Sequence, residues 1–206
     1  MRIFHLQSTV LLAVIVLISG CSTGRRAFER GDYDKAVYQA VNRLRNDSDN
    51  RKASATLRRA YNYAVNTHLK QVEKKAKSSN PYRWERVVDH YRAINALHDE
   101  ILYCPACLSL IPEPKSYADD LSNARQQAAE QRYQMAQKAL ENKEMRSNAL
   151  MAHRHLLVVQ QMMPGYKNTA NLLEEAMYFA TLHVLVEPIP APTTIMQLNQ
   201  EFLSIN

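Results

Sequence analysis

Glycine is almost absent from this chain of 206 residues, with only 4 in the whole sequence. Two of them, Gly20 and Gly24, lie near the start, which leaves Gly31 and Gly165 for the rest of the chain. Phosphate-binding loops of nucleotide-binding proteins need closely spaced glycines, because their backbone must approach the phosphates. The sequence therefore excludes P-loop and dinucleotide-binding fingerprints. Few glycines with many Ala, Leu, Gln and Arg residues favour a helical protein.

Motifs of common hydrolases and metal enzymes are also missing. The sequence contains no nucleophile-elbow serine, no H-E-x-x-H motif and no calcium-binding loop. The doublets Asp119-Asp120 and Glu174-Glu175 lie on expected helices, where adjacent side chains diverge by about 100°, so neither makes a catalytic carboxylate pair. We interpret His153 and His155 as surface or rim residues for the same angular reason. We expect a protein that is not an enzyme and that carries no cofactor or metal.

Charge is distributed unevenly along the chain, although the whole chain carries a net charge of +6. From Arg25 to Arg86 there are 16 Lys and Arg against 7 Asp and Glu, a net charge of +9. From Val87 onward there are 9 against 13, a net charge of −4. The basic half indicates contact with anionic lipid headgroups, the cell wall or an acidic partner, or else a solvated helix face.

The first 21 residues combine a basic start, a short apolar run and a cysteine. The apolar core from Val10 to Ile18 is too short to span a bilayer as a helix. Ser19 and Gly20 are small residues directly ahead of Cys21. This segment resembles the signal of bacterial lipoproteins, in which an aliphatic residue and two small residues precede the lipidated cysteine.

The resemblance implies that residues 1–20 are a signal peptide and that Cys21 carries diacylglycerol and a further acyl chain. Two or more acyl chains hold a protein stably in a membrane, whereas a single chain binds reversibly. In this family an aspartate after the cysteine tends to retain the protein at the inner membrane, and Ser22 stands there instead. The resemblance therefore implies an outer-membrane protein that faces the periplasm. Such a protein is not expected to bind nucleic acid.

A second informative string runs from Ala27 to Val37. Within it, Gly31 is expected to supply a left-handed turn, Asp32 to cap the next helix, and Ala36 to give a small contact at the helix crossing. The string resembles the turn and second helix of a tetratricopeptide repeat, which implies an array of antiparallel helix pairs. The next helix-turn signals follow after 49 and 62 residues. These distances exceed the about 34 residues of a standard repeat, so we expect elongated helices.

Apolar residues recur at steps of three and four along most of the remaining sequence, which is the period of an amphipathic helix. We expect helices over residues 52–77, 81–102, 116–142, 145–163 and 168–180, with a loop over 103–115. After Ala180 the aliphatic and β-branched run 182–187 indicates a short strand, ended by prolines. Such a strand would open a further domain or add to a partner's sheet, unless the run is the end of a helix.

The expected organisation is therefore an all-α, tetratricopeptide-like array with one short strand near the C-terminus. Residues 1–20 form the signal peptide and 21–26 a lipidated tether. The helical repeat domain covers 27–181, and the strand with the proline-rich segment covers 182–206.

Cys104 and Cys107 form the sharpest candidate for chemistry, as a C-x-x-C pair. They could form a disulfide or stay as paired thiols, catalyse thiol-disulfide exchange, or supply half of a metal site. Thioredoxin-type enzymes place the first cysteine at a helix N-terminus after a strand, whereas this pair follows a helix end. A zinc site needs four ligands, and only His90 and His98 lie nearby in sequence. We favour a structural pairing, with the other two interpretations open.

These observations predict a lipid-anchored envelope protein that acts as a protein-protein interaction scaffold or accessory subunit of an assembly or secretion system. The alternatives are a structural subunit of a multiprotein envelope complex and a thiol-disulfide protein built on the C-x-x-C pair.

Overall fold

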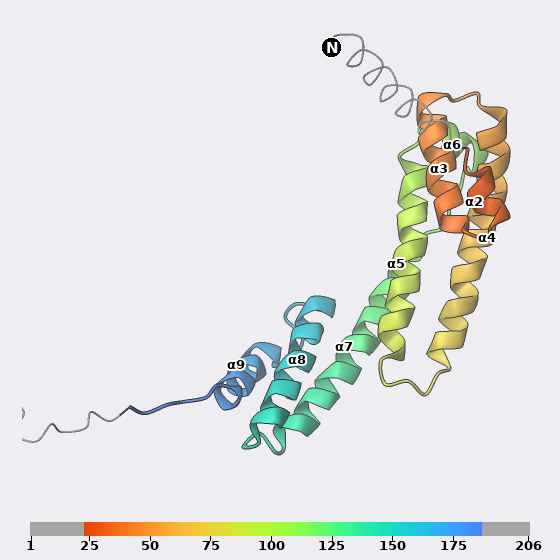
Figure 1. Ribbon diagram of the computed structural model, residues 1–206. Coiled ribbons are helices and arrows are strands. Elements are labelled where there is room, and N and C mark those ends of the chain that lie inside the picture. Colours follow the sequence, from red (N-terminus) through yellow and green to blue (C-terminus); the bar gives the residue numbers. More distant parts are fainter. Residues whose placement is uncertain (1–22, 187–206) are drawn as a thin grey trace, which may run out of the picture.

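A computed structural model describes residues 23–186, and the secondary structure of this part of the chain is entirely helical (Figure 1). The predicted all-α class is thus confirmed. In chain order the helices are α2 (Arg25–Glu29), α3 (Tyr33–Asn46), α4 (Arg51–Ala76), α5 (Arg83–Leu102), α6 (Pro105–Leu110), α7 (Ala118–Leu140), α8 (Arg146–Met162) and α9 (Thr169–Ala180). Cys21, with the expected signal peptide, lies outside the described residues.

The turn between α2 and α3 forms as its sequence predicts. Gly31 has a φ of +81°, in the left-handed region, and the Asp32 side chain caps α3 by accepting a hydrogen bond from the Lys35 N–H. Ala36 is fully buried at the helix crossing. Gly24 also has a positive φ of 77°, and a Cβ there would lie 2.3 Å from the Ala36 carbonyl oxygen. Only glycine lets α2 approach α3 this closely.

The helical domain begins earlier than the sequence indicated. Arg25 and Arg26, expected in the tether, form the first residues of α2. Phe28 holds this short helix in place, because its ring lies 5.4 Å from Tyr33 and 5.5 Å from Tyr63. The tether prediction for residues 21–26 was therefore too long by at least these two arginines.

The expected loop over 103–115 was wrong in its first half, where Pro105–Leu110 form α6. Proline is compatible with the first turn of a helix, because the N–H that it lacks would have no helical partner there. Cys104 is the N-cap, and its sulfur accepts a hydrogen bond from the Cys107 N–H at 3.3 Å. A six-residue helix between prolines is too short for its apolar period to show in the sequence.

The expected strand is absent from the part of it that the structure describes. Residues 182–186 follow α9 without regular secondary structure and are exposed, whereas residue 187 and those beyond lie outside the described range. The β-branched run predicted local strand propensity, but a strand also needs a neighbouring strand to satisfy its N–H and C=O groups. The described helices provide none.

Two hydrophobic cores divide the helices into lobes, and α5 belongs to both. The first core joins α2, α3, the first half of α4 and α6 to Leu97 and Ile101 of α5. The second core joins α7, α8 and α9 to Val87 and Val88, which lie near the other end of α5. A single 20-residue helix therefore forms a wall of both lobes.

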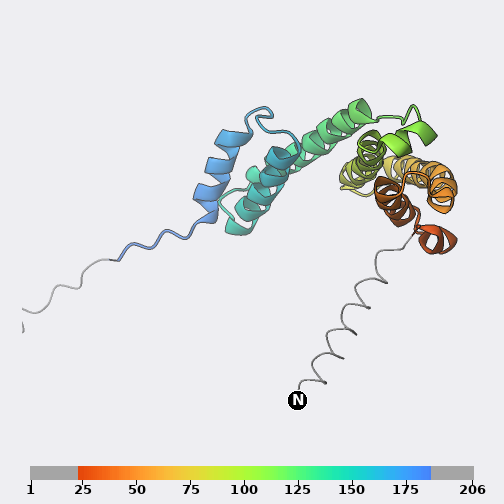
Figure 2. The same cartoon turned by 90° about the horizontal axis from the view of Figure 1, so that it is seen from above.

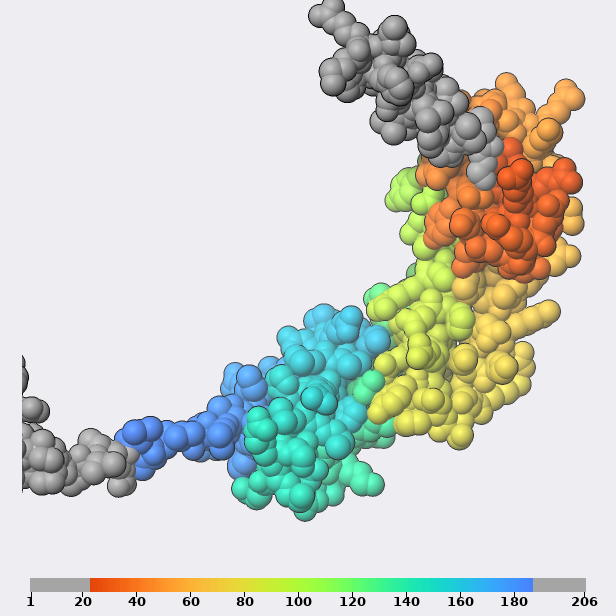
Figure 3. All heavy atoms as spheres, viewed as in Figure 1, coloured from red at the N-terminus to blue at the C-terminus, as the bar shows by residue number. Residues whose placement is uncertain are grey.

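The helices follow one another as antiparallel neighbours and build a curved body rather than a closed bundle (Figures 2 and 3). α3, α4 and α5 lie together at one end, and α7, α8 and α9 at the other. Residues 182–186 leave the body at the end of α9. Within residues 23–186, every helix falls short of the length or the apolar content that crossing a membrane requires.

Candidate functional site

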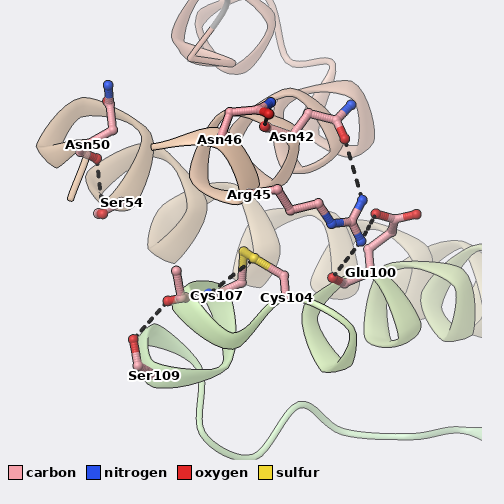
Figure 4. Close-up of a disulfide and its surroundings, with 10 residues drawn as sticks. Asn42, Arg45, Asn46, Asn50, Ser54, Glu100, Cys104, Cys107 and Ser109 are labelled. Atoms are coloured by element: carbon pink, nitrogen blue, oxygen red, sulfur yellow. Dashed lines mark hydrogen bonds and ion pairs between the residues drawn. A yellow bond between two sulfur atoms is a disulfide. The ribbon is translucent and has the colours of Figure 1, made fainter. Parts of the chain in front are cut away.

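Cys104 and Cys107 are joined by a disulfide at the start of α6 (Figure 4). Arg45 of α3 braces the neighbouring end of α5, because its guanidinium lies 2.9 Å from a carboxylate oxygen of Glu100 and also donates to the Glu100 carbonyl. The disulfide thus belongs to the packing of α3, α5 and α6 around the first core.

The position of the disulfide changes the reason for which thiol-disulfide exchange is disfavoured. Cys104 does sit at a helix N-terminus, which the sequence did not indicate. Its exposed fraction is only 1%, however, and that of Cys107 is zero. Thiol-disulfide exchange requires an attacking thiolate to reach one of the sulfur atoms. Burial of both sulfur-bearing residues therefore favours a structural role over redox catalysis.

The structure does not bring His90 and His98 to the cysteines. His98 Nδ1 lies 2.9 Å from a carboxylate oxygen of its neighbour Asp99, and His90 contacts His68. Across residues 23–186 no group of three or more His, Cys, Asp and Glu side chains is placed to hold a metal ion. The C-x-x-C pair therefore has no completed ligand set in this part of the chain.

A partly buried polar cluster centred on Arg132 joins α5, α7 and α8 in the second lobe. From α7, Arg132 donates two hydrogen bonds to the carboxylate of Glu85 on α5, at 2.6 and 3.1 Å. Its third contact is His155 Nδ1 on α8, at 2.8 Å, and its guanidinium also lies 4.1 Å from the centre of the Tyr82 ring. A forked guanidinium–carboxylate pair fixes orientation as well as distance. The cluster therefore sets how α7 and α8 sit against α5.

His155 is buried, with 8% of its surface exposed, which overturns its assignment to the surface. Because arginine only donates, His155 Nδ1 must be the unprotonated acceptor in this hydrogen bond. Burial, and then the positive charge of Arg132, lowers the pKa of His155 below its ordinary value. Sequence reasoning missed this role because it depends on which face of α8 meets α7.

A second polar chain runs through the contact between α3, α4 and α5. Asp34 accepts a hydrogen bond from His68 Nε2 at 2.9 Å, and His68 Nδ1 lies 3.0 Å from His90 Nδ1. Burial, and then the neighbouring His68 and Lys75, lowers the pKa of His90. The three residues are 34 and 22 positions apart in the sequence, so no local motif could have predicted their meeting.

His90 also lines a cavity of about 440 Å³ at the α4–α5 turn. The other lining residues come from the end of α4, the turn itself and the start of α5, and most are basic or polar: Lys75, Ser78, Asn80, Arg83, Arg86 and Asp89. The excess of positive charge in the first half of the sequence was a signal for such a surface. It did not indicate which of the 16 basic residues would gather.

Large apolar side chains are exposed at the C-terminal end of the body. Met177 and Tyr178 of α9 are 53% and 62% exposed, and the apolar residues of the segment that follows α9 are exposed as well. The His183 ring lies 4.9 Å from the Tyr178 ring, so the segment is held against α9 at its start. We call these residues, together, the terminal apolar surface: Met177, Tyr178, Leu182, Val184, Leu185 and Val186.

Comparison with known proteins gave no match: no family model, curated protein or solved structure resembles the chain. The lipoprotein and tetratricopeptide resemblances therefore stay predictions from the sequence.

Proposed function

We propose that this protein is a lipid-anchored envelope scaffold that holds a protein partner through its terminal apolar surface. The signal-like segment that ends at Cys21 supports the anchor. The terminal apolar surface supports the partner, and it is the observation that carries the proposal.

Exposed apolar residues are ordinary when they are scattered, but a contiguous group is typical of an interaction site. Leu182, Leu185 and Val186 are between 74% and 84% exposed and follow one another closely in the chain. Residues without a paired strand can also donate and accept backbone hydrogen bonds along a partner's sheet edge. Both apolar side chains and free backbone groups are therefore presented to a partner.

A charge placed in this surface tests the partner-binding role. In Leu185→Lys, we expect loss of an envelope protein that co-purifies in fixed ratio with the full-length lipidated chain from detergent-solubilised membranes. The matched control is Leu102→Lys, which changes another exposed leucine, 44% accessible, at the far end of α5. Equal recovery of partner with both variants would contradict the proposal.

The anchor is tested separately by Cys21→Ala and cell fractionation. We expect the unmodified chain in the membrane fraction and the variant outside it, because the acyl chains supply the membrane affinity. A variant that stays in the membrane fraction would remove the anchor from the proposal without touching the partner surface.

The alternative of a self-assembling structural subunit uses the same surface with a second copy as the partner. Light scattering of the purified full-length chain in detergent separates the two functions. A mass of one chain per particle supports the scaffold, and an oligomer that Leu185→Lys dissociates supports the alternative.

A further inference from the structure

Among the residues that line the cavity at the α4–α5 turn, the basic side chains outnumber the acidic ones. Lys75, Arg83 and Arg86 face it, and Asp89 is the acidic residue of the lining. Asp89 lies 3.9 Å from Arg86, the longest of the ion pairs among residues 23–186. Neither Lys75 nor Arg83 pairs with a carboxylate in that range. Cations gathered in a recess without partners attract a negatively charged ligand.

Arg83 gives an independent sign of a missing acceptor. Its Nε atom is buried and has no hydrogen-bond partner. Arg43 and Arg125 also have a buried unpartnered Nε, but neither residue lines this cavity, and another nitrogen of Arg43 pairs with Asp47 at 3.0 Å. Within residues 23–186, the side-chain interaction of the Arg83 guanidinium is with the Trp84 ring, whose centre lies 6.0 Å away, the outer limit of a cation–π contact. An unsatisfied buried donor in a native structure requires an explanation, and an absent ligand is one.

The back of the cavity is held in place by the polar chain that begins at Asp34. A carboxylate only accepts, so His68 donates from Nε2 to Asp34. The remaining nitrogen of His68 then holds the ring of His90 through Nδ1. A side chain fixed in this way loses little freedom when a ligand arrives, which favours binding.

The chemistry of the lining selects the ligand. Forked guanidinium donors, an ammonium group and the polar side chains of Ser78 and Asn80 match the oxygens of a phosphoryl group. Phe, Tyr and Trp do not line the cavity, so it lacks a platform for stacking a nucleobase. Its volume of about 440 Å³ exceeds that of one phosphate and admits a second polar group.

We propose that this cavity binds a phosphoryl group, carried by a lipid headgroup or by a small phosphate compound, with Arg83, Arg86 and Lys75 as its cationic partners. This site is distinct from the terminal apolar surface, so it stands whether or not the scaffold proposal holds.

The only tryptophan of the sequence, Trp84, reports on the site because it lies beside Arg83. Full-length protein in neutral detergent is titrated with inorganic pyrophosphate and, separately, with dihexanoyl phosphatidylglycerol, while calorimetry and Trp84 emission are recorded. We expect saturable binding of at least one probe. Binding of pyrophosphate alone indicates a free phosphate ligand, and binding of phosphatidylglycerol alone indicates a headgroup.

Three variants with the same loss of charge complete the test. Arg83→Gln and Lys75→Gln should each weaken binding about tenfold, the effect of one charge-assisted hydrogen bond. Lys74→Gln removes an exposed charge from the same turn of α4 outside the cavity lining, and should leave the affinity unchanged. If Arg83→Gln fails to fold, Lys75→Gln decides, because Lys75 forms no ion pair with the acidic residues of 23–186. The proposal fails if neither probe saturates, or if Lys74→Gln weakens binding as much as Lys75→Gln.

Discussion

The two lobes of this protein hold their helices together with different kinds of interaction. The core of the first lobe is built from alanines, aliphatic residues and a buried disulfide. The second lobe relies on polar clusters as well: Arg132 joins Glu85 to His155, and Lys167 pairs with Glu130 at 2.5 Å across the turn before α9. Both lobes therefore contain ionisable groups at helix contacts, namely the chain from Asp34 through His68 to His90 in the first lobe and the Arg132 cluster in the second, and the buried disulfide belongs to the first.

The two lobes also differ in the part of the chain that lies at their outer ends. The first lobe lies nearest the residue expected to be lipidated, since its described chain begins at Thr23. The second lobe ends in the terminal apolar surface. Under the proposed function, the first lobe is the attached end and the second lobe is the end that contacts a partner, and α5 connects the two through a shared core wall.

The largest expected effect comes from cavities in the two cores. Leu57→Ala in the first core and Leu156→Ala in the second remove fully buried side chains and should each cost about 2–5 kcal/mol of unfolding free energy. Because α5 lines both cores, we expect each variant to shift one common transition in urea.

Leu157→Ala is the control, since its side chain is about half exposed at 49% and its loss should change little. Two separate transitions, each moved by only one of the core variants, would show that the lobes are independent.

Breaking the Arg132 cluster of the second lobe should have the next largest effect. Arg132→Met leaves Glu85 partly buried without its partner and should cost about 2–3 kcal/mol, less than a fully buried pair because both side chains keep some solvent contact. Arg154→Met, an exposed arginine of α8, is the control. Adding Glu85→Gln should recover part of the loss in a double-mutant cycle by urea unfolding. Simple additivity would mean that the pair does not couple.

Removing the disulfide should have a smaller effect, with its local part in the first lobe. It closes a loop of only four residues, 104–107, and a loop of that length contributes about 2 kcal/mol by chain entropy. We expect Cys104→Ala with Cys107→Ala to lower stability by no more than that in urea unfolding. Amide exchange should accelerate most in α6 and in the adjoining end of α5, and a larger acceleration in α8 and α9 than in α6 would contradict the assignment to the first lobe.

The smallest expected effect is a loss of thermal stability at acidic pH. The pKa of His155 is lowered in the folded protein from its ordinary value of 6.5, so the unfolded chain binds more protons below that pH. The stabilisation that neutral His155 contributes is therefore fully present above about pH 6.5. It is lost as the pH falls through the lowered pKa of the folded protein. We expect His155→Gln to flatten the fall in melting temperature between pH 7.5 and pH 5.5, conditions chosen to bracket the ordinary value.

Gln161→Ala changes an exposed residue of the same helix that does not titrate, and this control should keep the original slope. His90 contributes in the same direction, because its pKa is also lowered. A melting temperature that rises on acidification would contradict both assignments.

Structural features could be predicted from the sequence where they depend on residues that are neighbours in the chain. The turn at Gly31, the cap at Asp32 and the crossing at Ala36 all depend on residues within a few positions of one another. The short helix α6 was missed because a single turn or two carries no period, and its cap is a cysteine rather than a typical capping residue.

Contacts between helices could not be predicted in the same way. Glu85 and Arg132 are 47 residues apart, and their pairing depends on the angle at which α7 crosses α5. The Nε atom of Arg83 is buried without a hydrogen-bond partner, and this depends on the packing around Arg83, which the sequence does not show. The exposed apolar run after α9 was visible as composition, but its lack of a partner strand required the structure.

Photo-crosslinking in intact cells tests the division between an attached end and a partner-binding end most directly. A photoreactive amino acid is placed at Leu185 on the terminal apolar surface or at Leu102 in the first lobe, both exposed leucines. The scaffold account predicts a discrete crosslinked protein from Leu185 and none from Leu102. The same product from both positions, or a product from Leu102 alone, would contradict it.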